Sequence, residues 1–207
     1  MSKTDPLYYE SLARKHGYQW IAGVDEAGRG PLAGPVVAAA VIIPEGALLQ
    51  GVKDSKKMTE KAREKAFEEI HKIAVAVGVG VISHRAIDQM NILNATLTAM
   101  KQAVVSLDPL PDHVFVDGIH EIPISIPQKC LIKGDQICKS ISAASIIAKV
   151  YRDRIMSSYH DRFPEYGFLH HKGYGTAQHR SVIAFLGPSP VHRLTFKGVK
   201  GLDTGKN

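Results

Sequence analysis

Cysteine is scarce in this chain, which has two, Cys130 and Cys138, among 207 residues. Two cysteines are too few for a disulfide framework and their spacing fits no zinc site, so we expect free thiols in a reducing compartment. No apolar run approaches the roughly 20 residues that span a bilayer. The first residues, M-S-K-T-D-P, lack the apolar core of a secretion signal. These absences predict a cytoplasmic protein without membrane contact.

Internal repeats, low-complexity tracts and evident linkers are also absent. With an apolar content of 44%, the chain has enough hydrophobic side chains for one substantial core. We expect a main domain over residues 19–160, preceded by an extension over 1–18. A subdomain of helices and loops is expected over 161–200, followed by a short, polar, mobile tail over 201–207.

The formal net charge is +6, and nearly all of the excess lies in the last third of the chain. Residues 133–207 contain 12 Lys and Arg against 5 Asp and Glu, whereas residues 1–132 contain 14 against 15. Such a basic segment suits a polyanion whose phosphates are held by lysines and arginines. An ordinary basic surface explains the charge equally well.

Hydrophobic periodicity predicts an α/β protein. Short apolar runs indicate strands, and apolar residues spaced by three or four indicate helices. The expected strands cover residues 20–24, 36–43, 74–82, 113–116 and 130–132. The expected helices cover residues 59–71, 92–107, 140–159 and 176–186, with a loop over 162–175. Strands that cluster first and then alternate with helices predict a mixed sheet with helices on its faces and a C-terminal helical subdomain.

Four acidic residues share one sequence context, because each follows an apolar run and lies near a glycine. They are Asp25, Glu26, Asp117 and Asp135. A sheet can gather such side chains at one edge, and carboxylates are ligands for hard divalent cations such as Mg²⁺ or Mn²⁺. Their combined charge of about −4 would balance two ions, a common device for phosphoryl transfer. We therefore predict a divalent-metal site at this edge.

Asp25 and Glu26 are adjacent in sequence, and adjacent residues of a regular strand point to opposite faces. Both can reach one site only if the strand ends early, so we predict that the glycine-rich turn begins at Glu26. For any single acid the alternative is an ordinary turn residue or helix cap, which is the commoner role of an isolated Asp-Gly pair.

The glycines that follow this strand raise the alternative of a dinucleotide-binding loop. That fingerprint requires G-x-G-x-x-G at the start of a helix. Here Gly28 and Gly30 are followed by Gly34, one residue too late, and Pro31 interrupts the segment. A dinucleotide site is therefore disfavoured.

Two further segments carry groups suited to nucleic acid. Lys56 and Lys57 lie in a loop whose donors could hold phosphates. Tyr174 lies in the basic, glycine-rich segment 170–175, where an aromatic ring can stack on a base or sugar. Solvated lysines and a tyrosine packed on the surface are the alternatives.

The helix expected over 140–159 carries charged residues to which the sequence assigns no site. Lys149 and Asp153 lie four residues apart, a spacing that predicts an ordinary surface ion pair. Arg152 and Arg154 have too little sequence context for a role. No Ser/His/Asp or Cys/His order stands out, and the pairs of histidines lack metal-ligand spacing.

Segment 24–35, V-D-E-A-G-R-G-P-L-A-G-P, closely resembles the signature of ribonuclease HII, the type 2 ribonuclease H family. Further segments resemble that family in the same order: K-D-S-K-K at 53–57, N-I-L-N-A-T at 91–96, V-D-G at 116–118, K-G-D at 133–135, I-S-A-A-S-I-I-A-K-V-Y-R-D at 141–153 and H-K-G-Y-G-T at 171–176. The resemblance covers about residues 19–200.

The resemblance implies a ribonuclease H-like mixed β-sheet flanked by helices, and an endonuclease activity. The family hydrolyses the RNA strand of RNA/DNA hybrids and incises DNA duplexes 5′ of embedded ribonucleotides, leaving 3′-hydroxyl and 5′-phosphate ends. The residues that fall on its catalytic, metal-binding acids are Asp25, Glu26, Asp117 and Asp135. The resemblance thus selects the four acids already singled out by their context.

The resemblance also implies substrate contacts. Gly28, Arg29 and Gly30 fall on the turn that contacts the ribose 2′-hydroxyl at the cleavage junction. Tyr174 falls on the tyrosine that packs against the adjoining deoxyribose. Since the main chain of a glycine-rich turn can read a 2′-hydroxyl whatever the base, we expect weak sequence preference.

Other functional classes stay open at this stage. A non-catalytic binder of RNA/DNA hybrids would keep the basic surface without turnover, and a different nuclease or integrase could use the same sheet. The expected partners are RNA/DNA hybrid and ribonucleotide-containing duplex DNA, bound by a monomer. The tail contains no recognisable sliding-clamp motif.

Near the C-terminus the chain departs from the family pattern. The segment V-H-R-L-T-F-K-G-V-K resembles one that more often reads H-R-x-S-F-x-P-V. Thr195 stands in place of the serine and Gly198 in place of the proline. Because the hydroxyl is retained, we expect the departure to affect the local backbone shape more than the activity.

Overall fold

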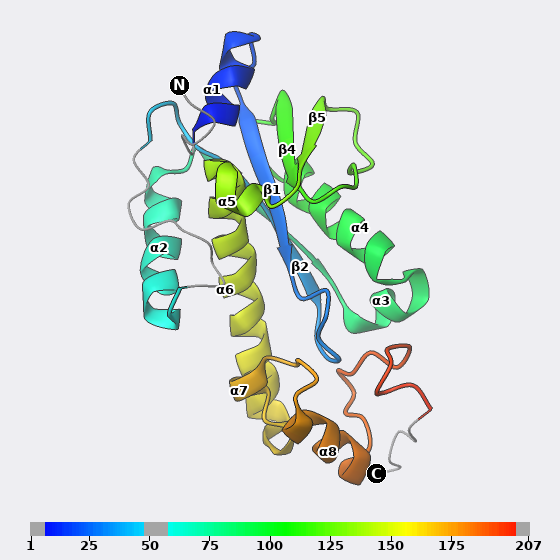
Figure 1. Cartoon of the computed structure of the whole chain (residues 1–207). Helices are drawn as coiled ribbons and strands as arrows, with labels where there is room; N and C mark the ends of the chain where they lie inside the picture. The colour runs from blue at the N-terminus through cyan, green and yellow to red at the C-terminus, as the bar shows by residue number, and fades with distance from the viewer. Residues whose placement is uncertain (1–6, 48–57, 202–207) are drawn as a thin grey trace.

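In the computed structural model, which describes residues 7–47 and 58–201, five strands form one sheet in the order β3-β2-β1-β4-β5 (Figure 1). The strands are β1 Ile21–Ala27, β2 Val36–Ile42, β3 Ala76–Ile82, β4 His113–Asp117 and β5 Gln128–Leu131. β2 is antiparallel to β1 and β3, whereas β4 is parallel to β1 and β5. The mixed sheet predicted from the sequence is confirmed. Of the tail predicted over 201–207, only Gly201 lies within the described residues.

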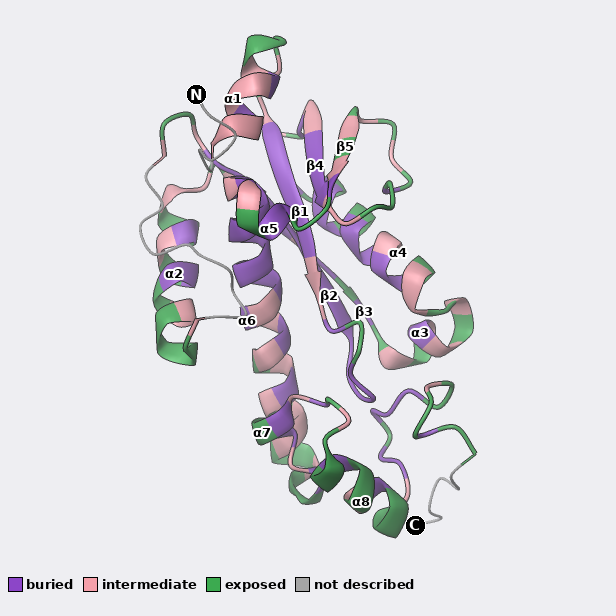
Figure 2. Cartoon of the chain, viewed as in Figure 1, coloured by how far each residue is buried: buried purple, intermediate pink, exposed green. Residues whose placement is uncertain are grey.

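Helices cover both faces of this sheet. The described residues form the helices α1 Tyr8–Lys15, α2 Glu60–Ile73, α3 His84–Met90, α4 Ile92–Val105, α5 Gly134–Ile137, α6 Lys139–Arg162, α7 Phe168–His171 and α8 Ala177–Leu186, of which α7 and α8 lie beyond the end of the sheet (Figure 1). α6 and α2 lie on one face, and α4 with α3 lies on the other (Figures 1 and 2). Within the described ranges, no helix is both long and apolar enough to cross a membrane.

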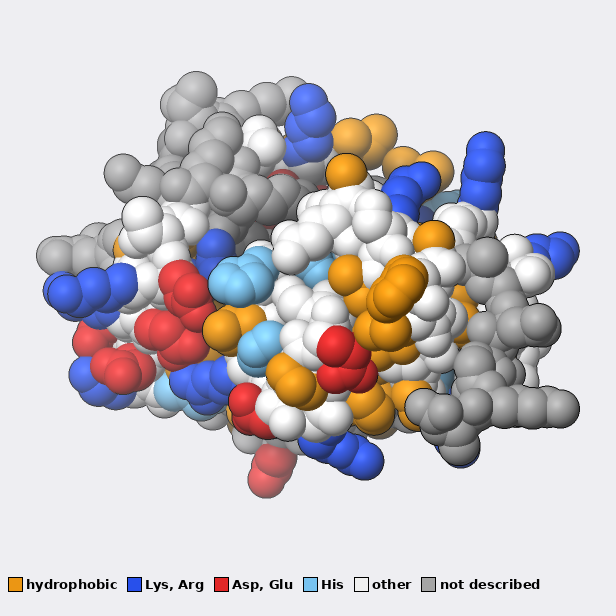
Figure 3. Space-filling view, turned by 90° about the horizontal axis from the view of Figure 1, so that it is seen from below, with side chains coloured by type: hydrophobic (Ala, Val, Ile, Leu, Met, Phe, Trp, Pro, Cys, Tyr) orange, Lys and Arg blue, Asp and Glu red, His pale blue; other side chains and the backbone are white. Residues whose placement is uncertain are grey.

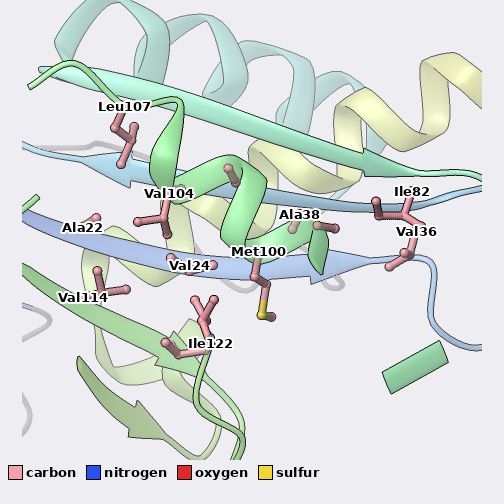
Figure 4. Packing of buried hydrophobic residues seen from close by; sticks show 14 of the residues in the cluster. Ala22, Val24, Val36, Ala38, Ile82, Met100, Val104, Leu107, Val114 and Ile122 are labelled. Carbon is pink, nitrogen blue, oxygen red and sulfur yellow. The ribbon is translucent and has the colours of Figure 1, made fainter. Parts of the chain in front are cut away.

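β2 is buried along its whole length, as its unbroken apolar sequence predicts. Small alanine side chains at residues 38–40 let α4 and α6 approach the strand from opposite sides, so the core packs tightly in both layers. On the α4 side, Val24, Met100 and Val104 lie in one cluster (Figure 4). Full burial of such side chains contributes about 1.5–3 kcal/mol each. Met100 and Val104 of α4 therefore belong to the core.

β1 lies directly against the start of α6. A Cβ atom at Gly23 would lie 2.2 Å from the backbone nitrogen of Ile141, so only glycine permits this approach. The contact aligns the first turns of α6 with the half of β1 that carries Asp25 and Glu26.

α1 is joined to the same helix by buried hydrogen bonds. Glu10 Oε1 accepts hydrogen bonds from the backbone N–H of Ser140 at 2.8 Å and from its hydroxyl at 2.9 Å. The Cys138 thiol donates to the same oxygen at 3.2 Å. Both Cys138 and Cys130 are free thiols, as predicted. The segment that precedes β1 thus packs into the main body of the fold.

The C-terminal region folds back onto the turn that follows β1. Leu32 and Ala33 of that turn pack in one hydrophobic cluster with Met156 of α6 and Phe168 of α7. An antiparallel bridge pairs Ala33 with His192. Residues distant in sequence are therefore held beside the turn.

The prediction of a loop over 162–175 is wrong, because this segment contains α7 and a 3₁₀ helix at Pro164–Tyr166. Pro164 suits the first position of a short helix, and Gly167, with φ 69°, separates the two elements. Single helical turns lack the three- or four-residue apolar repeat that reveals longer helices. The single turn α5 was not predicted for the same reason, and the two-turn helices α1 and α3 were not predicted either.

Candidate active site

Asp25 and Asp117 lie at neighbouring positions of adjacent parallel strands. Val24 of β1 is paired with Val116 of β4, and the next residue of each strand is an aspartate. Side chains at matching positions of parallel strands point to the same face. For Asp25 this is the face of α6, where the Ser145 hydroxyl donates a hydrogen bond to its carboxylate.

Asp25 is a buried carboxylate, with 4% of its surface exposed. Burial raises its pKa well above the ordinary value, and the negative charges of Glu26 and Asp117 raise the pKa further. Hydrogen bonds from the Ser145 hydroxyl and from the Glu26 N–H, at 2.7 Å, oppose this shift. The ionised side chain is therefore short of compensating positive charge, a condition that a bound cation would relieve.

Glu26 lies on the opposite face of β1. The prediction that the turn begins at Glu26 is wrong, because β1 continues to Ala27 and Glu26 pairs with Ala38 of β2. β2 supplies ladder partners as far as Val37, so the strand stays regular past both acids. Glu26 consequently points towards α4 while Asp25 points towards α6.

A cleft lined by α4 and by the ends of β1 and β4 brings Glu26 together with Asp117 and Arg29. Arg29 Nη1 lies 3.4 Å from Glu26 Oε1. The remaining lining comes from α4 and from the loop after β4, namely Leu93, Thr96, Leu97, Met100, Gly118, Ile119 and His120. Two of the predicted catalytic acids thus share one recess with the G-R-G turn.

Asp135 lies in α5 and not directly at a strand end. β5 ends at Leu131, and Lys133, in the left-handed conformation with φ 56°, turns the chain into α5. The N–H of Gly134 donates to Asp117 Oδ1 at 2.7 Å. Asp135, which is buried, directly follows Gly134 in the sequence, and Gly134 is bonded to Asp117.

The chemistry of these acids fits a hard divalent cation, because carboxylate oxygens are its preferred ligands and Asp25 carries uncompensated charge. Across residues 7–47 and 58–201, however, no three His, Cys, Asp or Glu side chains are gathered closely enough to hold one ion. The structure places Asp25 beside Asp117, and Asp117 in a cleft with Glu26. The assignment of all four acids to a metal site stays a prediction.

The G-R-G turn and Tyr174 lie together. A Cβ atom at Gly30 would come 3.8 Å from Tyr174 Cε1, and the tyrosine is 47% exposed. Gly28 has φ 98°, a left-handed conformation that glycine adopts without strain. The four substrate-binding residues expected here therefore form one group, which adjoins the cleft through Arg29.

Comparison with known protein families identifies the family to which this chain belongs. The family model described as Ribonuclease HII matches residues 22–199. The chain belongs to the ribonuclease HII family. The Ribonuclease HII of Geotalea uraniireducens is 59% identical over 194 residues, which cover 94% of this chain and 90% of that protein. Membership makes the chain an endoribonuclease that cleaves the RNA of RNA/DNA hybrids.

Solved structures share the fold of this ribonuclease HII family member. The crystal structure of ribonuclease H2 from Pyrococcus horikoshii OT3 matches with a TM-score of 0.75 and 29% identity, covering 88% of this chain and 96% of that one. Bst-RNase HIII, solved in complex with Mn²⁺, matches with a TM-score of 0.70 and 20% identity, covering 87% and 68%. The ribonuclease H-like architecture implied by the sequence is confirmed.

The structure does not describe every residue singled out in the sequence, and it adds one to the cleft. Lys56 and Lys57 lie outside the described residues, so their contact with phosphate stays a prediction. His120 lines the same cleft as Glu26 and Asp117, although its sequence context gives no sign of this. Only the fold of the loop after β4 brings it there.

Sequence analysis also missed two buried arginines, Arg152 and Arg193, which donate hydrogen bonds to the main chain around the turn. Arginines that bind backbone carbonyls leave no complementary side chain to be recognised. The ion pair predicted between Lys149 and Asp153 is confirmed, with Nζ 2.7 Å from Oδ1.

The two departures from the family pattern have distinct structural outcomes. The Thr195 hydroxyl donates to Asp88 Oδ1 at 2.5 Å, so the group shared with serine is used. Gly198 has φ 101°, which proline cannot adopt because its ring fixes φ near −65°. The local backbone of this chain at residue 198 is therefore incompatible with the commoner proline.

Proposed function

We propose that this family member also incises duplex DNA on the 5′ side of an embedded ribonucleotide, leaving 3′-hydroxyl and 5′-phosphate ends. The observation that carries the proposal is the cleft in which Glu26 and Asp117 adjoin Arg29, the central residue of the G-R-G turn. A phosphate bound beside these acids would lie next to a main chain able to contact the 2′-hydroxyl of the neighbouring sugar.

The turn and Tyr174 supply the two contacts that a junction between deoxyribose and ribose requires. Gly28 and Gly30 have no side chains, so the main chain can approach the 2′-hydroxyl closely. The half-exposed ring of Tyr174, beside Gly30, offers a flat surface for the adjoining deoxyribose. Because neither contact involves a base edge, cleavage should depend little on base sequence.

The residues that would hold divalent ions are Asp25, Glu26, Asp117 and Asp135. Mg²⁺ or Mn²⁺ bound there would supply charge neutralisation at the phosphate and an activated water. The chain itself orients the carboxylates: Asp25 accepts from the Ser145 hydroxyl, and Asp117 accepts from the Gly134 N–H. These contacts fix the directions of two carboxylates before the substrate binds.

The nucleic acid should cross the side of the molecule that carries Arg29 and Tyr174. The end that carries α7 and α8 exposes large apolar side chains among side chains of both charges (Figure 3), including Leu169, Phe185 and Leu186. A surface of this kind suits a phosphate backbone less well than a basic groove. We therefore propose that residues 161–200 complete the substrate groove through Tyr174 and not through this end.

Incubation with a DNA duplex that contains one ribonucleotide tests the proposal. In Mg²⁺ or Mn²⁺ the protein should make one nick, on the 5′ side of the ribonucleotide. Asp117→Asn should lower the nicking rate by roughly 10³-fold or more, because a carboxylate at the reacting phosphate is lost. Substrate affinity, measured by fluorescence anisotropy, should change by less than about threefold, since most affinity comes from phosphate contacts.

Asp161→Asn is the matched control, because it removes an exposed acid of α6 and should leave nicking unchanged. Cleavage of an all-DNA duplex at the same rate as the ribonucleotide substrate would refute ribose specificity and favour another nuclease on this sheet. Binding of hybrids without cleavage in either metal would favour the non-catalytic binder.

A further inference from the structure

Arg152 of α6 is fully buried and donates to three backbone carbonyls. Its Nε donates to Pro35 O at 3.1 Å, its Nη1 to Lys172 O at 3.0 Å and its Nη2 to Ala33 O at 3.2 Å. Pro35 and Ala33 belong to the segment after β1, whereas Lys172 lies two residues before Tyr174. One guanidinium therefore ties together the two segments that carry the proposed ribose contacts.

Arg193 is also fully buried and binds the turn itself. It donates to Gly28 O at 2.6 Å, to Arg29 O at 3.0 Å, to Gly34 O at 3.0 Å and to Pro35 O at 3.1 Å. Four carbonyls of a segment of eight residues thus converge on one guanidinium. Such a set of directional bonds fixes the path of the main chain far more tightly than apolar packing would.

The two arginines make an electrostatically costly pair. In the part of the chain that the structure describes, neither forms an ion pair with a carboxylate. Burial and then the charge of Arg152 lower the pKa of Arg193 to about 9. Buried charges without counter-ions are poor sources of stability, and apolar residues of similar volume often serve stability better. Arg152 and Arg193 therefore serve the geometry of the main chain that they bind more than the stability of the fold.

Direct contacts connect Arg152 with the proposed ribose-reading residues. A Cβ atom at Gly28 would lie 2.1 Å from Arg152 Nε, so the turn is packed directly onto the guanidinium. The guanidinium carbon lies 5.9 Å from the centre of the Tyr174 ring. The position of this one group thus affects both the turn and the tyrosine.

We propose that Arg152 and Arg193 are positioning residues that set the spacing between the main chain of residues 28–30 and the ring of Tyr174, and thereby determine which phosphodiester beside a ribonucleotide is cut. This inference rests on the proposed function, because it concerns the ribose and deoxyribose contacts of that site. Neither arginine touches the reacting atoms. A change in either should alter junction selectivity more than the hydrolysis of continuous RNA.

The test compares two substrates for Arg152→Lys and Arg193→Lys. The first is a DNA duplex with one ribonucleotide and the second is an RNA/DNA hybrid, in which every position presents a 2′-hydroxyl. Lysine keeps the charge but cannot bind several carbonyls in one plane. We expect kcat on the first substrate to fall about tenfold or more, because the junction is misaligned. On the hybrid kcat should fall less than about threefold. On an additional substrate, a DNA duplex that contains four ribonucleotides, the cut positions should shift.

Arg154→Lys is the matched control, since Arg154 lies on the same helix, pairs with Glu64 and should leave the selectivity ratio unchanged. Gly28→Ala gives a second route if a lysine variant does not fold, because its Cβ would displace the Arg152 guanidinium without removing it. Gly46→Ala has similar backbone strain in open space and controls for that strain.

Equal losses on both substrates with unchanged cut positions would overturn the proposal, because the arginines would then act on stability alone. A wild-type protein that cuts hybrids but makes no nick at a single ribonucleotide would contradict the proposed function, and this inference with it. A wild type that nicks, with variants of unchanged selectivity, would contradict this inference alone.

Discussion

Asp25 is held next to two other carboxylates in a site that excludes most water. Asp25→Asn should therefore raise the free energy of unfolding of the metal-free protein, by on the order of 1–2 kcal/mol, because it removes a buried negative charge. The same variant should not cleave. Urea denaturation in a chelator measures the first effect and nicking of a ribonucleotide duplex the second.

The exposed Asp161 provides the comparison for this variant, because Asp161→Asn should change stability by less than about 0.5 kcal/mol. Added Mn²⁺ should stabilise the wild type more than Asp25→Asn. An Asn variant that is less stable than the wild type in chelator would show that Asp25 is not electrostatically strained.

The role of a residue can be predicted from the sequence only when its interaction partner can also be recognised there. Asp25 and Asp117 each follow an apolar strand, so their meeting at one sheet edge could be predicted. Arg152 and Arg193 bind backbone carbonyls, which every residue has, and no pattern reveals the choice of carbonyl. Their role became visible only when the folded main chain was known.

α6 depends on a residue from another element at its N-terminus. Its first backbone N–H groups need acceptors, and Glu10 of α1 provides a carboxylate oxygen 2.8 Å from the Ser140 nitrogen. Glu10→Ala should lower the free energy of unfolding by roughly 2 kcal/mol, because it leaves buried donors unpaired and removes a favourable charge at the helix start.

Urea denaturation checks this prediction, and Glu10→Gln should cost less than Glu10→Ala because the amide oxygen still accepts. Glu68→Ala on the exposed face of α2 serves as the control. Equal stability of Glu10→Ala and Glu68→Ala would mean that the cap contributes nothing.

The extent of an element is harder to predict than its existence. The strands and the long helices follow from apolar periodicity, and β2 was found within one residue of its expected bounds. The end of β1 was not, because Val37 and Ala38 of β2 continue the ladder beyond Asp25. A partner strand supplies this information, and the local sequence does not contain it.

Three buried histidines connect the C-terminal region to Tyr174, one of the expected substrate-binding residues. The backbone N–H and hydroxyl of Ser189 donate to His192 Nδ1, at 2.9 and 2.7 Å. His192 Nε2 then donates to His179 Nε2 at 3.0 Å, and His179 Nδ1 donates to Tyr174 O at 2.9 Å. His171 stacks on His179 at 4.1 Å. Each tautomer in this chain of bonds is set by its neighbours, so an added proton has no acceptor.

This arrangement predicts acid sensitivity of the whole fold. Burial lowers the pKa of His179 to about 4 and, with the charge of His179, that of His192 to about 3. The unfolded chain therefore binds more protons below pH 6.5, and stability falls as pH falls through that value. Between pH 7 and pH 5 each histidine should cost roughly 2 kcal/mol of unfolding free energy.

Urea denaturation across this pH range provides the measurement, and the slope difference between variants is the readout. His192→Gln should make the free energy of unfolding depend less steeply on pH. His170→Gln, at an exposed site, should leave this pH dependence unchanged. Parallel curves for the wild type and His192→Gln would contradict the assignment.

α6 extends from the sheet to the C-terminal region (Figure 1). The same helix therefore carries both Ser145, whose hydroxyl binds Asp25, and Arg152, whose guanidinium lies against Gly28. Ser145 and Arg152 are seven residues apart, close to two full turns, so both groups face the same side. Inserting a single residue between them would rotate one against the other by about 100°. We therefore expect the interval of α6 between Ser145 and Arg152 to tolerate no change in length.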